Sequence, residues 1–493
     1  MKMNKIIFTL LFFIPIALFS QSKQDTTKQN QDTLTLFKKR VLEYAEIDIL
    51  TSFYTQDGKN ASVTGGIGTE KLNNFATNIN VAIPLNDDDI LSIDATVSAY
   101  SSASSSNLNP FSGASSGDDD DDDDDKDGGN SKSIIGTPWV ESSGASVSDV
   151  WVSGNIGYSH SSDNRNNIYS ANINFANEYD YTSFGAGFGL AKLFNDKNTE
   201  LNLGVNMYLD SWRPEYPTEI KTYVQENGNL NADFFNGVDI LDSNGNPINK
   251  ESINAWKPIN TTLIENKGRN TFSFSLSLSQ IVSKTTQFSI FTDITYQKGW
   301  LGNPMQRVYF SDIDNFYIGN ASSIPNYTNP NNKDVFQLAD DIERLPDNRL
   351  KIPVGIRLNQ YINEFLVIKA YYRYYFDDWG IVSNTFNVEL PIKIGDKFTL
   401  YPNYRYYNQS ASDYFAPFEQ HLSTSDFYTS DYDLSKFNAN QFGLGLKYTD
   451  ILTKGHIWKF GLKNMTLNYN YYLRSTGLKA HIVSLGAKFI LDK

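Results

Sequence analysis

Hydrophobic and polar residues alternate along most of this chain, and the alternation returns in segments of about 10 to 14 residues. In residues 200–210 the odd positions from Leu201 to Leu209 are all apolar, and in residues 272–279 phenylalanine and leucine alternate with serine. A period of two predicts β-strands with one face toward apolar surroundings, because successive side chains of a strand point to opposite faces. Helical periodicity is nearly absent, and the only helix predicted is a short one at Leu34–Tyr44.

The alternation predicts about sixteen strands, within a range of 14 to 18. They are expected near residues 43–55, 74–85, 90–102, 147–160, 166–177, 183–194, 199–212, 269–282, 286–298, 351–362, 366–377, 381–392, 397–409, 437–449, 457–472 and 478–491. An even number of strands places both ends of the chain on the same side of a membrane, as in single-chain bacterial barrels.

The connections between these strands differ systematically in length. Every second connection is short, namely 86–89, 161–165, 195–198, 283–285, 363–365, 393–396 and 450–456. All the long connections fall on the other side: 56–73, 103–146, 213–268, 299–350 and 410–436, with short exceptions at 178–182, 378–380 and 473–477. Short periplasmic turns and long extracellular loops are typical of outer-membrane barrels.

The predicted fold is therefore all-β: a transmembrane, antiparallel, up-and-down β-barrel. Only a closed barrel allows strands to satisfy every backbone group within a lipid bilayer. The composition agrees, since the chain has no cysteine and 14% aromatic residues, among them 30 tyrosines and 32 phenylalanines. The expected location is the outer membrane of a Gram-negative bacterium, with outer-membrane lipids and the barrel-assembly machinery as partners.

The N-terminus has the pattern of a secretory signal peptide. A short basic start precedes an apolar stretch from Ile6 to Phe19, which is shorter than the roughly 20 residues that a membrane-spanning helix needs. We expect a signal peptide at 1–20, a periplasmic N-terminal segment at 21–42 and the barrel at 43–493.

Several strings resemble one known family. They are QDGKNASVTGGIGTEKL (56–72), IPLNDDDILSIDATVSAYSSASSSNLNP (83–110), GASVSDVWVSGNIGYSHSSDNR (144–165), YLDSWRPEYPTE (208–219), YRYYFDDWG (372–380) and LYPNYRYYNQSASDYFAPF (400–418). From about residue 40 onward the chain resembles the outer-membrane barrels called domain of unknown function 3570, found mainly in Bacteroidota. The resemblance implies gene neighbours that include a small lipoprotein, a thioredoxin-like protein and a flavin transferase, and it carries no assigned chemistry.

An acidic run lies within the outer connection 103–146, as an insertion at 117–129. Asp123, Asp125 and Asp127, followed by Gly128, match the first half of a calcium-binding loop, but the position of the closing glutamate is taken by Ile134. Two interpretations remain open: a solvated low-complexity insertion, and loose binding of a divalent cation such as calcium. No other cofactor is expected.

The inner face of the predicted barrel carries the candidate functional residues. If the apolar positions face lipid, the polar positions of neighbouring strands face the lumen. The lumen-lining candidates are Arg357, Lys369, Arg373, Tyr375, Arg405, Tyr407, Glu389 and Asp293. Arginines on adjacent strands are able to form an anion-attracting constriction. The alternative is a structural ladder in which arginine, glutamate and tyrosine side chains pair across the inner wall.

Catalysis is not expected. The four histidines, His160, His421, His456 and His481, are predicted at turns, in an outer loop and on the last strand, and none shares a strand face with a serine and an acid. The net charge of −14 owes −8 to the nine aspartates and one lysine of residues 118–127, so nothing basic enough for nucleic acid is present.

Two functions remain for a barrel of this kind. The favoured one is a channel for small solutes that acts with a surface or periplasmic lipoprotein. The alternative is a non-conducting structural or assembly barrel, whose extracellular loops bind a partner protein or a glycan. The outer connections 213–268 and 299–350 are longer than idle connectors need to be.

Overall fold

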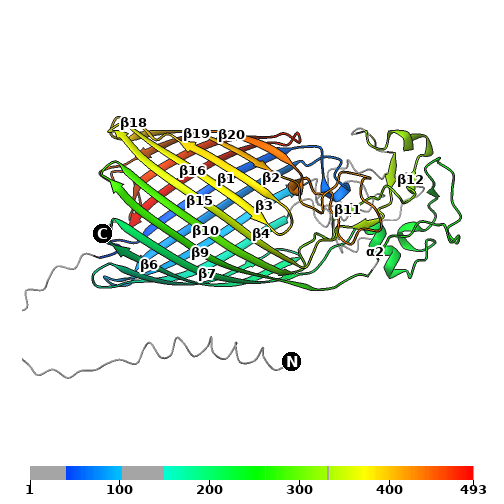
Figure 1. Cartoon of the computed structure of the whole chain (residues 1–493), viewed down its shortest axis with the longest axis horizontal. Coiled ribbons are helices and arrows are strands. Elements are labelled where there is room, and N and C mark those ends of the chain that lie inside the picture. The colour runs from blue at the N-terminus through cyan, green and yellow to red at the C-terminus, as the bar shows by residue number, and fades with distance from the viewer. Residues whose placement is uncertain (1–39, 103–148, 261, 330–331, 333, 492–493) are drawn as a thin grey trace, which may run out of the picture. The chain divides into compact units, whose positions relative to one another are not determined.

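A computed structural model of the chain describes residues 40–102, 149–260, 262–329, 332 and 334–491. These residues form one closed antiparallel barrel with a group of folded loops at one end (Figure 1). Strand β1 (Glu46–Asp57) pairs with β2 (Leu72–Pro84) on one side and with the last strand, β23 (Lys479–Leu491), on the other. That pairing closes the wall, so every strand of the barrel has two neighbours.

The predicted barrel of sixteen strands is confirmed. The remaining wall strands are β3 (Asp89–Ser102), β4 (Asp149–Ser161), β5 (Asn167–Asn177), β6 (Tyr181–Phe194), β7 (Thr199–Trp212), β9 (Lys267–Ser283), β10 (Thr286–Gly299), β15 (Asn348–Asn363), β16 (Leu366–Asp377), β17 (Val382–Glu389) continued by β18 (Ile392–Ile394), β19 (Phe398–Gln409), β20 (Phe437–Thr449) and β22 (Phe460–Arg474). The break between β17 and β18 contains Pro391, which has no N–H to donate to the ladder. A two-residue strand, β21 (His456–Ile457), adds to the start of β22.

The short and long connections lie at opposite ends of the barrel, as expected. The turns after β2, β4 and β6 are at the end where β23 finishes, and the labelled elements β11, β12 and α2 lie beyond the other end (Figure 1). The short outer connections are also present, as residues 178–180, 378–381 and 475–478. We call the end with the long loops the outer mouth.

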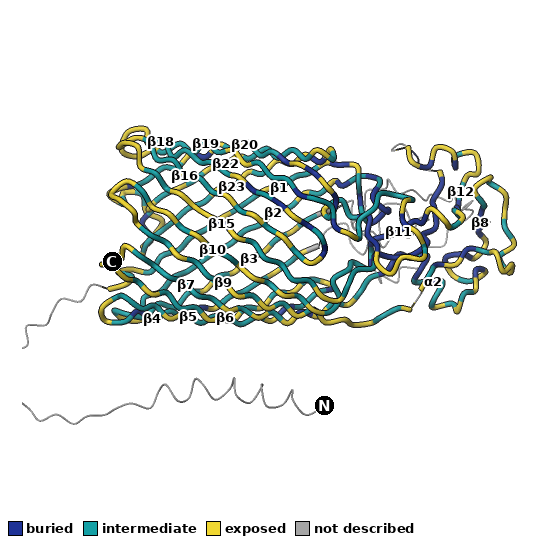
Figure 2. Tube along the Cα trace, viewed as in Figure 1, coloured by how far each residue is buried: buried dark blue, intermediate teal, exposed yellow. Residues whose placement is uncertain are grey.

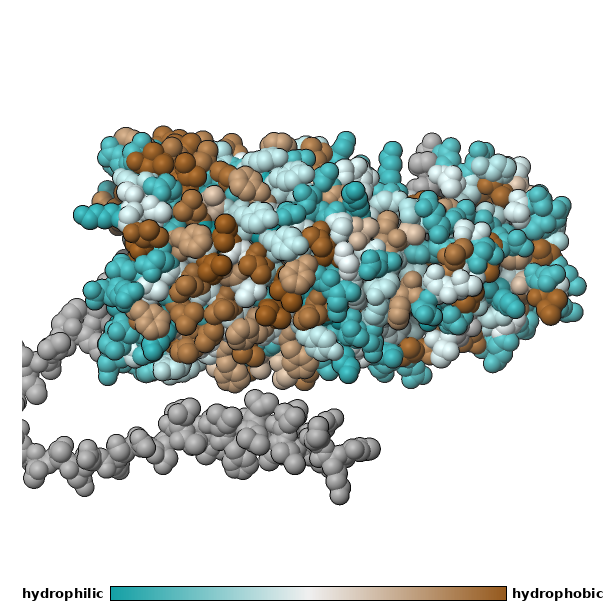
Figure 3. Space-filling view, viewed as in Figure 1, coloured by the Kyte–Doolittle hydropathy of each residue, from teal (hydrophilic) through white to brown (hydrophobic). Residues whose placement is uncertain are grey.

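The outside of the barrel wall is apolar. Large hydrophobic side chains stand out from it, such as Phe188 on β6, whose side chain is 70% exposed, and Ile173 on β5. The apolar surface gathers over the strands, whereas the loop end is mainly hydrophilic (Figure 3). This distribution matches a belt of strands in lipid with loops in water.

Small residues make one part of the inner wall thin. Gly185, Gly187 and Gly189 of β6 face the lumen beside asparagine and serine side chains of β5 and β7. A Cβ on Gly187 would lie 2.4 Å from Asn172 Oδ1, because the amide of the neighbouring strand occupies that space. The inner face of these strands is therefore a flat polar surface.

A helix was expected at Leu34–Tyr44. Residues 40–44 are irregular instead, and residues 34–39 lie outside the described residues. Among the described residues an α-helix, α2 (Thr218–Gln225), lies in an outer connection where no helix was expected. This helix has only eight residues, and its packing against neighbouring loops stabilises it. A hydrophobic periodicity over so few residues is a weak signal in the sequence. None of the helices in the described residues is long and apolar enough to cross a membrane.

Four of the outer loops fold into a compact unit that we call the cap, made of the described residues within 58–71, 213–266, 300–347 and 410–436. Its elements are η2 (Ser62–Thr64), α2, η3 (Asp233–Phe235), β8 (Ile240–Leu241), β11 (Arg307–Val308), β12 (Tyr317–Gly319), η4 (Ala321–Asn326), β13 (Val335–Gln337), β14 (Asp341–Ile342) and η5 (Tyr432–Leu434). Among the described residues, most buried ones lie in the cap and at the mouth rather than in the barrel wall (Figure 2).

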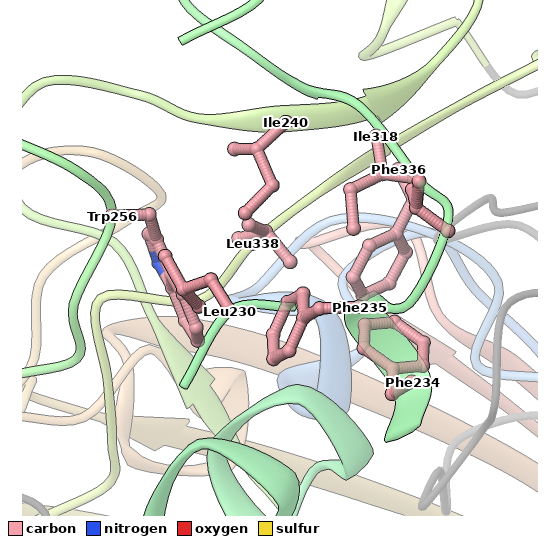
Figure 4. Packing of buried hydrophobic residues seen from close by; sticks show 9 residues of the cluster. Leu230, Phe234, Phe235, Ile240, Trp256, Ile318, Phe336 and Leu338 are labelled. Carbon is pink, nitrogen blue, oxygen red and sulfur yellow. The ribbon is translucent and has the colours of Figure 1, made fainter. Parts of the chain in front are cut away.

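The cap has a hydrophobic core of its own. Trp256 and Phe235 pack with Ile240, Ile318 and Leu338, which come from two different connections (Figure 4). The β8, β12 and β13 strands form a small sheet that joins the same two connections. The predicted long loops 213–268 and 299–350 thus share one folded structure in their described residues, which sequence alone did not reveal.

A buried ion pair ties three of the loops together near the mouth. Arg307 Nε donates to Glu219 Oε1 at 2.7 Å, and the two side chains are 1% and 0% exposed. The same guanidinium donates from Nη1 to the carbonyl of Val63, in the loop between β1 and β2. Since Glu219, Arg307 and Val63 belong to different outer connections, this contact joins three segments of the cap to one another.

Candidate functional site

Two of the predicted arginines, Arg373 and Arg405, lie on the inner wall near the outer mouth and line the same cavity. Arg373 of β16 lies opposite Thr385 of β17, which in turn lies opposite Tyr407 of β19. Tyr407 lies opposite Ala439 of β20, and Ala439 lies opposite Arg474 of β22. Thr385 and Ala439 are fully buried, so the long side chains on either side cover these small residues.

These side chains surround a cavity of about 330 Å³, which we call the basic cavity. Its lining residues are Arg373, Arg405, Tyr407, Asp433, Phe437, Ala439, Gln441, Tyr472 and Arg474. Arg474 is paired, because its Nη1 lies 2.7 Å from Asp433 Oδ1 and its guanidinium stacks 4.2 Å from the centre of the Phe437 ring. Arg373 and Arg405 form no ion pair with any described residue, and Arg373 Nε is buried without a hydrogen-bond partner there. The cavity thus carries an excess of positive charge.

Two predicted candidates, Lys369 and Glu389, form a rung of the inner wall instead. Lys369 Nζ lies 2.9 Å from Glu389 Oε1 on the neighbouring strand, and it also lies 5.9 Å from the centre of the Tyr401 ring. A cation and a carboxylate that neutralise each other leave little charge for a passing solute. This part of the wall corresponds to the structural ladder.

Three further candidates lie apart from the basic cavity. Arg357 is held against aromatic rings, 4.6 Å from the centre of Phe291 and 5.7 Å from that of Tyr371. Tyr375 donates to Asp377 Oδ2, the carboxylate that also pairs with Arg349 at 2.5 Å. Asp293 is exposed on β10, opposite Ser275 of β9. The eight predicted residues are therefore distributed over several places on the inner wall.

The sequence missed Arg474 and Asp433. The predicted strand 457–472 ended two residues too early, so Arg474 fell into an expected outer connection, while β22 continues to Arg474. The alternation of Asn468, Asn470, Tyr472 and Arg474 was a usable signal for the longer strand. Asp433 comes from the cap, and no local pattern places a loop carboxylate over a lumen.

A second cavity, of about 430 Å³, adjoins the first at the outer mouth, and we call it the acidic cavity. It is lined by Tyr54, Gln56, Asn60, Ala61, Ser62, Glu70, Gln306, Asp431, Asp433, Tyr472, Arg474, Leu478 and Ile482. The two cavities share Asp433, Tyr472 and Arg474. The paired Arg474 and Asp433 therefore lie between a basic and an acidic compartment.

Burial shapes the acidic cavity. Burial raises the pKa of Asp431 to about 6, and the nearby negative charge of Asp433 adds to the effect. Burial also raises the pKa of Glu70, although the backbone N–H of Asn60 donates to its carboxylate at 3.1 Å. Gln306 is only 9% exposed, and its Oε1 has no hydrogen-bond partner among the described residues. The cavity thus contains one buried acceptor, Gln306 Oε1, that has no donor among the described residues.

The remaining predictions of chemistry concern histidines and metals. His421 is buried in the cap with its Nε2 2.8 Å from the carbonyl oxygen of Thr429, and burial lowers the pKa of His421. Within the described residues, no group of three or more histidine, cysteine or acidic side chains is arranged to hold a metal ion. Asp123, Asp125 and Asp127 of the acidic run lie outside the described residues.

Fold and site together define the class of this molecule: a β-barrel protein of the outer-membrane type, with a polar lumen and a folded cap. The chain belongs to the family described as "Protein of unknown function (DUF3570)", whose model matches residues 11–485. This match confirms the family that the sequence strings resemble. The comparison with curated proteins found no match.

Three solved outer-membrane barrels that the chain resembles in structure are distant from it in sequence. A bacterial polysaccharide outer-membrane secretin is 8% identical, with a TM-score of 0.39 over 91% of this chain and 98% of that one. The toluene transporter TodX of Pseudomonas putida is 7% identical, with a TM-score of 0.35 over 92% and 90%. A FadL homologue of Pseudomonas aeruginosa is 9% identical, with a TM-score of 0.36 over 91% and 90%.

Several of the strings that carry the family resemblance lie at the outer mouth. Glu219, which closes the string 208–219, forms the buried ion pair with Arg307. In the string 372–380, Asp377 pairs with Arg349, and the Trp379 ring lies 4.3 Å from the same guanidinium. These strings therefore contribute contacts within the cap and along the rim of the barrel.

Proposed function

We propose that this protein is a channel for small solutes that attracts anionic groups at its outer mouth. The observation that carries the proposal is the basic cavity, in which Arg373 and Arg405 face the lumen without an ion pair to any described residue. Guanidinium groups in a narrow passage with low-dielectric walls concentrate anions, and arginine binds carboxylates and phosphates through two parallel hydrogen bonds.

The barrel supports a passage of this kind. Barrels of sixteen strands leave an aqueous lumen, whereas those of about eight strands are filled by side chains. Basic side chains outnumber carboxylates on the inner face from β15 to β22. The basic residues there are Arg349, Lys351, Arg357, Lys369, Arg373, Lys393, Arg405, Lys447 and Arg474, and the carboxylates are Asp377 and Glu389.

Planar-bilayer recording of the purified chain tests the proposal. We expect open channels whose reversal potential in a KCl gradient indicates a preference for chloride. Exchanging both Arg373→Gln and Arg405→Gln is expected to reduce the chloride-to-potassium permeability ratio several-fold, since the double variant removes the two unpaired charges of the cavity.

A matched control removes two charges from outside the lumen. Lys257 lies in the cap and Lys298 on the outer face of β10, and both are exposed. The pair Lys257→Gln and Lys298→Gln is expected to keep the wild-type ratio. Absence of conductance in the wild type would refute the channel, and an unchanged ratio in the arginine variant would refute the role of Arg373 and Arg405.

The cap favours a second candidate, a barrel whose outer loops bind a partner. The cap has a hydrophobic core of its own, which loops that only cover the mouth would not need. Ile253 on the surface of the cap is 87% exposed, so it is available for contact with a partner. A lipoprotein is the partner proposed here, in line with the expectation from sequence. Purification of the native protein from outer membranes, with and without Ile253→Asp, tests it: a partner that is retained by the wild type and lost in the variant would support docking on the cap.

A further inference from the structure

The acidic cavity is the feature of the mouth that a simple anion channel does not explain. Glu70 and Asp431 line it from two different connections, and neither forms an ion pair with a described residue. Gln306, which is 9% exposed, lines the same cavity with an Oε1 that lacks a donor among the described residues. Buried acceptors without donors are costly, so this cavity is suited to a ligand that brings N–H donors.

The basic cavity, in contrast, is suited to a ligand that brings hydrogen-bond acceptors. Arg373 and Arg405 bring donors that no described carboxylate accepts. A guanidinium presents five N–H donors and no acceptor, so its natural partner is a carboxylate or phosphate. The two compartments therefore differ in the sign of the group that each would bind.

The two compartments adjoin, because both are lined by Tyr472 and by the ion pair of Arg474 and Asp433. A ligand that occupies both would pass beside this pair, whose charges cancel. The Tyr472 hydroxyl accepts from Arg474 Nε at 3.4 Å and holds the pair at the boundary. A neutral, hydrogen-bonding middle section of a ligand fits such a boundary.

We propose that the two cavities form one binding site for a small zwitterion with an ammonium group at one end and a carboxylate at the other, such as a short peptide. The ammonium group lies in the acidic cavity beside Glu70, Asp431 and Gln306, and the carboxylate lies in the basic cavity against Arg373 and Arg405. The amides of the peptide pass beside Arg474 and Asp433. This inference rests on the proposed function, because it names the class of solute that the mouth of the channel selects.

A plain anion fits the whole site less well. It would be held by the basic cavity and repelled from the acidic one, and the acceptor of Gln306 would stay without a donor. A plain cation would be held by the acidic cavity and repelled from the basic one. Only a molecule with both charges satisfies both compartments at once, and cavities of about 430 and 330 Å³ accommodate a di- or tripeptide.

Isothermal titration calorimetry of the full chain in detergent tests the site with trialanine as the probe. We expect trialanine to bind, and N-acetyl-trialanine and trialanine amide each to bind at least about tenfold more weakly, because each has lost one charge-assisted set of hydrogen bonds. Equal binding of all three peptides, or no binding of trialanine, would overturn the proposal. This comparison uses the wild-type protein, so no variant has to fold.

Variants assign the two ends of the peptide. Glu70→Gln with Asp431→Asn is expected to weaken trialanine but not the acetylated peptide, and Arg373→Gln with Arg405→Gln to weaken trialanine but not the amide. Lys257→Gln with Lys298→Gln serves as the matched control with wild-type affinity. If both double variants weaken all three peptides alike, the assignment of the ends is wrong.

Conductance of the same preparations separates this proposal from the channel itself. Chloride-selective channels that do not bind trialanine would overturn the zwitterion site and leave the proposed function intact. Selective binding of trialanine by a barrel that does not conduct would overturn the channel and leave the site.

Discussion

Charged side chains of the inner wall and the cap fall into two groups, those that are paired within the protein and those that are not. Lys369 with Glu389, and Arg307 with Glu219, are neutralised in place and stabilise the wall and the cap. Arg373 and Arg405 are not neutralised by any described residue. The distinction is functional, because only charges without an internal partner remain for a solute.

A buried carboxyl makes the cap sensitive to pH. Asn303 N–H donates to Glu343 Oε2 at 2.6 Å, Thr429 donates to the other oxygen, and burial raises the pKa of Glu343 from 4.5 to about 8, with repulsion from Asp431 adding to it. Because the folded cap favours the protonated form, the contribution of Glu343 to stability is complete below about pH 4.5 and is lost as the pH rises through about 8.

We therefore expect the wild-type cap to lose about 1 kcal/mol of stability between about pH 7 and 9, and Glu343→Gln to remove that loss. Urea-induced unfolding followed by tryptophan fluorescence measures it, since Trp256 is buried in the cap core. The same decline with pH in the variant would show that another group is responsible.

At the scale of elements, the loop between β1 and β2 shows why one family string contains two adjacent glycines. Gly65 and Gly66 follow η2 with φ of 80° and 90°, a region that favours glycine. A Cβ on Gly65 would lie 2.5 Å from the Tyr309 ring, and one on Gly66 would lie 2.8 Å from the carbonyl oxygen of Ser430. These glycines let the loop lie directly against two other connections of the cap.

Gly66→Ala is expected to destabilise the cap by about 1 to 3 kcal/mol, because it adds backbone strain and a clash with a carbonyl. Gly237→Ala is the matched control. Gly237 has a φ of 69°, but its Cβ would meet nothing within 4 Å, so only the strain applies. The measurement is the same urea unfolding, and equal losses in the two variants would contradict a role for close packing at Gly66.

At the scale of the whole molecule, contacts between segments far apart in sequence join the connections that make up the cap. Arg307 reaches both Glu219 and the carbonyl of Val63, and Arg344 and Tyr428 exchange backbone hydrogen bonds between the connections 300–347 and 410–436. The cap therefore behaves as one unit above the lumen, and the position of the acidic cavity depends on it.

Replacing Arg307 by methionine is expected to cost about 3 to 5 kcal/mol, since it leaves Glu219 buried without its cation. Amide hydrogen exchange should show lost protection across residues 213–266 and 300–347, while the barrel strands stay protected. The double replacement of Arg307 by methionine and Glu219 by leucine should recover part of that protection. If the variant with methionine in place of Arg307 alone showed the same amide hydrogen exchange as the wild type, the ion pair would not be what stabilises the cap.

Most of the barrel was predictable because its determinants are local. Lipid on one side and water on the other impose a period of two on every strand, and this period identified sixteen strands and the side of each long connection. The same parity placed Arg373, Arg405 and Tyr407 on one wall. Arg474 was missed because a strand end was misjudged by two residues.

The sequence by itself thus determined the barrel, its family and the inward direction of the polar side chains, because alternation along a strand is read from neighbouring residues. Only the tertiary structure decided which lumen charges stay unpaired, and that the outer loops fold into a cap which brings Gln306, Asp431 and Asp433 to the mouth. Those outcomes depend on contacts between connections separated by a hundred residues or more, for which a single sequence carries no local signal.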